Sequence, residues 1–206
     1  ATKDRCSCAS IAAGIGFMVK VFPILILPIL VKRERSWLSR IRTLCLSSLA
    51  ALIVAAPFLA IAPQYLLASF LSIISRSPWE TPWASMEGYF GYGQVAPLQD
   101  RFDPASATLE VYKSNLPWIG ITIAFAAFYM LIWTRNFNSR RSLNAIAFTG
   151  LTVNLFLLFS KGYSPQFLIY VVPFAILVLP PLKAVAYLAI LAIINLIEYP
   201  IYLAFF

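Results

Sequence analysis

Residues 160–167, SKGYSPQF, combine side chains that could hold an anion. Ser164 directly precedes Pro165, and this pair predicts a helix start because serine caps free backbone N–H groups and proline fits the first turn. Lys161 lies three residues before the cap, and Gln166 adds amide donors. A helix N-terminus beside a cation is a ready anion site, and at a membrane surface the natural anion is a lipid phosphate. A simpler interpretation stays open, in which Lys161 extends to ordinary headgroups.

Lys20 is a second candidate for binding a lipid phosphate. If residues 11–31 form one span, this ammonium lies near mid-bilayer, where a charge costs at least about 2.5 kcal/mol and usually faces a cavity or a partner. Pro23 interrupts the backbone hydrogen bonds and could shape such a cavity. The alternative is a shallow or tilted helix whose lysine extends to the surface.

Residues 75–93, SRSPWETPWASMEGYFGYG, place aromatic rings beside carboxylates. Trp79, Glu80 and Trp83 could contact a sugar or an acceptor, because rings cover the apolar face of a sugar and carboxylates accept from its hydroxyl groups or act as a base. Glu80 is the candidate catalytic residue, although spacing alone assigns no catalytic pair. An aromatic loop resting on headgroups is the competing interpretation.

These candidates must be positioned by apolar helices. Of the 206 residues, 61% are hydrophobic and 12% are charged, and the mean hydropathy is +0.81. These values exclude an ordinary soluble domain and indicate an integral membrane protein. The net charge of +8 falls in short clusters between apolar runs, which favours a role in membrane orientation over nucleic-acid binding.

The expected fold is an all-α, polytopic bundle of transmembrane helices in one domain, within a longer protein. A helix needs about 20 apolar residues to cross the hydrocarbon layer. Six segments approach that length: residues 11–31, 43–61, 116–133, 143–159, 165–179 and 184–206. Residues 64–75 are shorter and are expected to form a helix lying on the outer surface.

Loop charges predict the orientation. Residues 32–42 carry five basic residues and one acidic residue, and residues 134–142 carry three arginines, so both loops are expected in the cytoplasm. Residues 62–115 carry three basic and five acidic residues and are expected outside. The segment at 160–164 then lies on the outer side as well.

Cysteine and histidine content predicts no metal site or cofactor, with a surface ligand pair at Cys6 and Cys8 as the alternative. There are three cysteines and no histidine, so a structural disulfide, a haem and a zinc site are all disfavoured. Glu198, in the last apolar run, either pairs with a cation or lies at the membrane interface.

Three segments together resemble the later half of polytopic membrane glycosyltransferases of the GT-C superfamily, with glycosyltransferase family 87 and the GPI-anchor mannosyltransferases closest. They are MVKVFPILILPIL at 18–30, SRSPWETPWASMEGYFGYG at 75–93 and FSKGYSPQFLIYVVPF at 159–174. The family pattern has a K-x-x-P segment, an outer loop with a tryptophan and an acid, and a K-x-x-S-P-Q-Y stretch that opens a late span. Phe167 stands where the family has tyrosine.

The resemblance implies a bacterial plasma-membrane enzyme that takes a sugar from a polyprenyl-phosphate carrier on the outer face. It also implies that the principal catalytic acid belongs to an earlier loop, which has no counterpart here. Lys161, Ser164, Gln166 and Lys20 are then expected to bind the carrier phosphate. The alternative is a non-catalytic subunit of a larger membrane complex, with other membrane subunits as partners. A transporter fragment has no internal repeat to support it.

Overall fold

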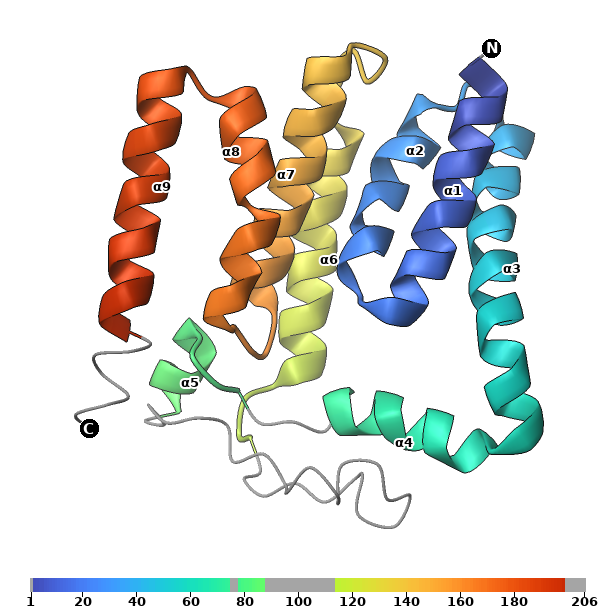
Figure 1. The fold of residues 1–206 in the computed structure, drawn as a ribbon, viewed down its shortest axis with the longest axis horizontal. Helices are drawn as coiled ribbons and strands as arrows, with labels where there is room; N and C mark the ends of the chain where they lie inside the picture. Colours follow the sequence, from blue (N-terminus) through green and yellow to red (C-terminus); the bar gives the residue numbers. More distant parts are fainter. Residues whose placement is uncertain (1, 75–77, 88–113, 199–206) are drawn as a thin grey trace.

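The computed structural model describes residues 2–74, 78–87 and 114–198, and these form helices with no strand. Figure 1 shows most helices standing side by side, with α4 running across one end. In chain order the helices are α1 (Thr2–Val19), η1 (Phe22–Ile26), α2 (Leu27–Arg33), α3 (Trp37–Ile61), α4 (Pro63–Ile74), α5 (Pro82–Met86), α6 (Trp118–Thr134), α7 (Ser142–Phe159), η2 (Pro165–Tyr170), α8 (Val172–Val178) and α9 (Pro181–Leu196). The all-α class is therefore confirmed.

The predicted span at residues 11–31 is a hairpin and not one helix. α1 ends at Val19, the chain reverses at Lys20, and η1 and α2 run back beside α1 (Figure 1). Pro23 stands in the first turn of η1, where its missing N–H is not needed. A Cβ atom on Gly16 would lie 2.6 Å from the Pro23 Cβ, so this close return requires glycine. Lys20 lies at the tip of the hairpin and not in the middle of a span.

Small residues allow α1 to pack closely on α3. A Cβ on Gly14 would collide with the backbone carbonyl oxygen of Ser47. Ser10 is fully buried, and Ser47 and Ala50 are 2% and 7% exposed. Close approach through small residues is typical of helix pairs in membranes.

Lys32 joins α2 to the end of α6. Its Nζ donates to the carbonyl oxygens of Trp133 and Arg135, the latter at 3.0 Å, and lies over the rings of Trp133 and Phe137. Cations stabilise a helix C-terminus because the last carbonyl groups lack partners within the helix. The hairpin is thereby tied to the second half of the molecule.

The later helices follow the predicted segments closely. α6 and α7 begin within two residues of the predicted starts, while α3 begins six residues earlier than predicted, after Ser36. The segment predicted at 165–179 is two helices, because Pro173 in the first turn of α8 cannot continue the hydrogen bonding of η2. Residues 199–206, within the last predicted span, lie outside the described residues, as does most of the predicted outer loop.

Two helices, α3 and α7, are long and apolar enough to cross a membrane. α6 and α9 are shorter apolar helices with large exposed side chains, including Ile119 at 80% and Leu182 at 83%. The loops at 34–36 and 135–141 and the start of α9 lie at one end of the molecule, and α4, α5 and residues 160–164 lie at the other (Figure 1). Apart from the start of α9, these are the two groups of segments that loop charge assigned to opposite faces.

Candidate functional site

The two motifs predicted from sequence are hydrogen bonded to each other. The Trp79 N–H donates to the Lys161 carbonyl oxygen at 3.0 Å, and the Tyr163 N–H donates to the Trp79 carbonyl oxygen at 3.2 Å. Trp79 and Gly162 thus form a parallel β-bridge. The Thr81 hydroxyl also donates to the Lys161 carbonyl oxygen, at 3.3 Å. Residues 78–81 and 160–164 therefore form one structural unit, named here the bridge site.

Glycine is required at the centre of the bridge site. A Cβ on Gly162 would collide with the indole ring of Trp79, which covers that position. Gly162 itself is buried. The Trp79 ring therefore packs against the backbone, which accounts for the glycine between Lys161 and Tyr163.

Glu80 is held in an unusual backbone conformation within the bridge site. Its φ is 50°, in the left-handed region that favours glycine. Hydrogen bonds of Trp79 on one side and Thr81 on the other fix it there. Thr81 also caps α5, since its hydroxyl accepts from the Ala84 N–H at 3.4 Å. Strained residues held by their surroundings are concentrated at functional sites.

The surroundings of Glu80 favour its neutral form. Burial, followed by the negative charge of Glu198, raises the pKa of Glu80. Burial also raises the pKa of Tyr163, with contributions from Glu198, Glu80 and Tyr187.

The end of α9 lies against the segment that follows residues 160–164, because the Asn195 side chain donates to the Pro165 carbonyl oxygen at 3.4 Å. Sequence reasoning missed Tyr163, and no local signal joins it to Glu198.

The predicted helix start at Ser164–Pro165 is correct, but the predicted cap is not formed. Ser164 has the extended backbone of an N-cap and Pro165 opens the helix, yet no side-chain hydrogen bond caps it. The first six residues form a 3₁₀ helix, whose Phe167 N–H donates to the Ser164 carbonyl oxygen at 2.7 Å. Gln166 is exposed. A helix this short supplies little dipole, so any anion site here depends on the lysines.

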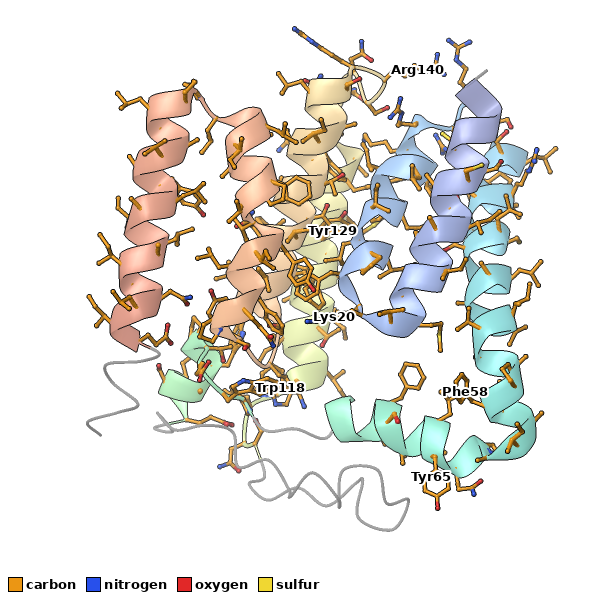
Figure 2. The ribbon with its side chains drawn as sticks, in the orientation of Figure 1. Lys20, Phe58, Tyr65, Trp118, Tyr129 and Arg140 are labelled. Carbon is orange, nitrogen blue, oxygen red and sulfur yellow. The ribbon has the colours of Figure 1, made fainter. Side chains whose placement is uncertain are left out.

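Both candidate lysines lie over aromatic rings. Lys161 Nζ is 4.9 Å from the ring centroid of Trp118, at the start of α6. Lys20 Nζ is 5.4 Å from the centroids of Phe167 and Tyr170. Phe167 therefore presents a ring face to a cation, a role that needs no hydroxyl group. Figure 2 shows Lys20 and Trp118 toward the same end of the molecule.

Trp83 lies in an aromatic group with Trp118 and Phe159. Its ring centroid is 6.0 Å from each of those rings. Its indole N–H is buried and has no hydrogen-bond partner among the described residues. Trp83 therefore lies beside Trp118, the residue whose ring contacts Lys161.

Glu87 anchors α5 to the segment before α6, and sequence reasoning assigned it no such role. Its Oε1 accepts from the Ser114 hydroxyl at 2.6 Å, the Asn115 N–H at 2.7 Å and the Leu116 N–H at 3.1 Å. The Ser114 hydroxyl in turn accepts from the Trp118 indole at 2.7 Å. This network fixes the ring over which Lys161 lies.

Metal-binding residues are not grouped in the described residues, since no three His, Cys, Asp or Glu side chains come together there. The cysteines Cys6, Cys8 and Cys45 are free. The bridge site thus offers Lys161 and the partly buried carboxyl group of Glu80, and Lys20 lies over rings of the adjoining helix η2. Comparison with known proteins identifies no family, since no family model, curated protein sequence or solved structure matches this chain.

Proposed function

We propose that the chain is a multi-pass protein of the membrane. The helices present large apolar side chains outward, and Ile53, Leu131 and Ile190 are all more than half exposed. Contact with water would be unfavourable for this surface, whereas lipid chains match it. In this arrangement residues 32–42 and 134–142 face the cytoplasm and the bridge site faces outside.

We further propose that the chain is part of a glycosyltransferase that uses a polyprenyl-phosphate-linked sugar donor on the outer face. The observation that carries this proposal is the β-bridge between Trp79 and Gly162. It joins the tryptophan–acid motif to the K-x-x-S-P-Q motif, which are about 80 residues apart in sequence. In the families that the chain resembles, both motifs belong to one enzyme.

Each group then has a role set by its chemistry. Lys161 and Lys20 attract the carrier phosphate, and their aromatic partners hold the ammonium groups at the edge of the apolar region. Trp79 and Trp83 provide ring faces for the sugar or acceptor. Burial raises the pKa of Glu80, which favours its protonated form more than in a free carboxyl group. This direction suits a general acid, which donates a proton, better than a general base.

Lys161→Ala in the reconstituted protein tests the proposal. We expect this change to weaken the use of a radiolabelled polyprenyl-phosphate sugar donor, measured as transfer at increasing donor concentration. Lys183→Ala is the matched control, since Lys183 lies at the opposite end of the molecule. Equal donor dependence in the two variants would exclude the assignment of Lys161.

A non-catalytic subunit of a membrane complex is the second candidate. It is favoured by the contacts of Lys161 and Lys20, whose cations already lie over rings of the chain itself. The apolar faces of α6 and α9 would then contact other subunits. The intact mass of the natural polypeptide distinguishes the candidates: about 23 kDa, the mass of this chain, favours the subunit, and a much larger mass favours the enzyme.

A further inference from the structure

The end of the molecule opposite the bridge site carries a concentrated positive charge. Apart from the first turn of α1, this end has nine basic side chains and one acidic side chain, Glu34. The basic residues are Lys32, Arg33, Arg35, Arg40, Arg42, Arg135, Arg140, Arg141 and Lys183. The other end, within the described residues, has Lys20 and Lys161 against Glu80, Glu87 and Glu198. The fold thus separates charge along its long helices.

Three arginines lie in the turn between α6 and α7, whose backbone is hydrogen bonded at several points. The Asn138 side-chain oxygen accepts from the Arg140 N–H at 3.1 Å, and its carbonyl oxygen accepts from the Arg141 N–H at 3.2 Å. Lys32 holds the start of the same turn through the Arg135 carbonyl oxygen. The three side chains are exposed, and their guanidinium groups make no hydrogen bond within the described chain. Figure 2 shows Arg140 projecting from this end.

The surroundings of this basic end indicate what it binds. Trp37 and Leu38, next to Arg35, are 71% and 78% exposed, and Leu131, one turn before Arg135, is 65% exposed. A ligand must therefore match guanidinium groups and, directly beside them, apolar side chains. An anionic bilayer does both, with phosphates at the level of the arginines and hydrocarbon beside the helices. A nucleic acid would match the charges alone.

We propose that this end binds the anionic headgroups of phospholipids, with the Arg135–Arg141 turn as the principal contact. Arginine suits the role because its planar guanidinium can donate two hydrogen bonds to one phosphate. The inference rests on the proposed membrane location and is independent of the glycosyltransferase assignment. The inference goes beyond the use of positive charge to set the orientation of the chain in the membrane. It requires that anionic lipids at the basic end associate with the chain in preference to neutral lipids.

The test uses the full chain reconstituted in phosphatidylcholine vesicles containing spin-labelled phosphatidylglycerol or spin-labelled phosphatidylcholine. The fraction of each label immobilised at the protein gives the lipid preference. We expect phosphatidylglycerol to be preferred at about 0.05 M salt and the preference to weaken at about 0.5 M, where charges are screened over a few ångströms. The triple variant Arg135→Gln, Arg140→Gln, Arg141→Gln is expected to reduce the preference at least about fivefold, which is the factor expected for the loss of even one basic residue at about 1 kcal/mol.

The matched control replaces the same three arginines with lysine, which keeps the charge and the backbone of the turn. This variant is expected to retain most of the preference. An unchanged preference in the glutamine variant overturns the inference, as does displacement of the lipid by a short single-stranded DNA. If the chain fails to associate with the vesicles at all, the membrane location itself is wrong. If the unmodified chain prefers phosphatidylglycerol but shows no sugar transfer, only the glycosyltransferase assignment is contradicted.

Discussion

Glu80 is the non-glycine residue with a positive φ among the described residues. A non-glycine residue at φ of 50° costs about 1–3 kcal/mol unless its surroundings compensate. Here the compensation comes from hydrogen bonds of its neighbours to the segment at 161–163. The Glu80 carboxyl group is close enough to Glu198 and Tyr163 for their charges to influence one another's pKa.

Replacing Glu80 with glycine separates these two effects. Glu80→Gly removes the backbone strain, and we expect it to raise the free energy of unfolding by about 1 kcal/mol, measured as an increase in the thermal midpoint. Glu80→Gln is the control, because it loses the charge and keeps the strain. Both variants are expected to lose sugar transfer. A glycine variant that is less stable than the glutamine variant would show that the left-handed conformation is not strained.

The raised pKa of Glu80 predicts how stability depends on pH. A carboxyl group whose pKa is higher in the folded state than in the unfolded state binds more protons when folded. Stability is therefore retained below the unfolded value near 4.5 and is lost as the pH rises through the raised folded value. Glu80→Gln should flatten this part of a plot of thermal midpoint against pH. A slope that persists in the variant would assign the titration to another group.

At the scale of elements, the sequence predicts helices better than their ends. The apolar lengths located α6 and α7, and Ser164–Pro165 located the start of η2. The early start of α3 was missed because Arg40 and Arg42 were assigned to a loop, although Ser36 is a cap whose hydroxyl accepts from the Ser39 N–H at 3.1 Å. The reversal at Lys20 was missed because Pro23 allows both an interrupted span and a turn.

The β-bridge lies beyond local prediction. It pairs residues about 80 positions apart through backbone groups, so side-chain patterns carry no information on its register. Resemblance suggested that the two motifs serve one site, but hydrogen bonds at Lys161 and Tyr163 determine how they meet. Sequence analysis predicted that the two motifs act together, and the fold shows how their backbones meet.

Gly162→Ala tests whether the bridge holds α5 against the segment before η2. The added methyl group must displace the Trp79 ring. We therefore expect the free energy of unfolding to fall by about 1–3 kcal/mol and the near-ultraviolet circular dichroism of tryptophan to change. Gly120→Ala is the matched control, since its Cβ would meet only the Pro117 Cβ, at an ordinary 4.0 Å. Because Gly120 lies within α6, alanine there should be neutral or stabilising. Similar destabilisation in both variants would argue against a specific role for Gly162.

At the scale of the whole molecule, the hairpin of α1 and α2 changes the topology. One span at residues 11–31 would put the first residues at the bridge-site end. The reversal at Lys20 instead brings the start of α1 to the end that carries Arg140 (Figures 1 and 2). The same reversal moves Lys20 from an expected mid-bilayer position to the level of the bridge site, where its ammonium lies over Phe167 and Tyr170.

Labelling with a membrane-impermeant maleimide tests this topology. Single cysteines are introduced at Asp4, Ser139 and Gln64 after the three natural cysteines are replaced by serine, and the protein is labelled in sealed, oriented vesicles. The hairpin predicts that Asp4→Cys and Ser139→Cys react from the same side and Gln64→Cys from the other, because α3 separates α4 from the basic end. If Asp4→Cys instead reacts together with Gln64→Cys, residues 11–31 cross the membrane once, and Lys20 returns to the position where a charge requires a partner inside the bilayer.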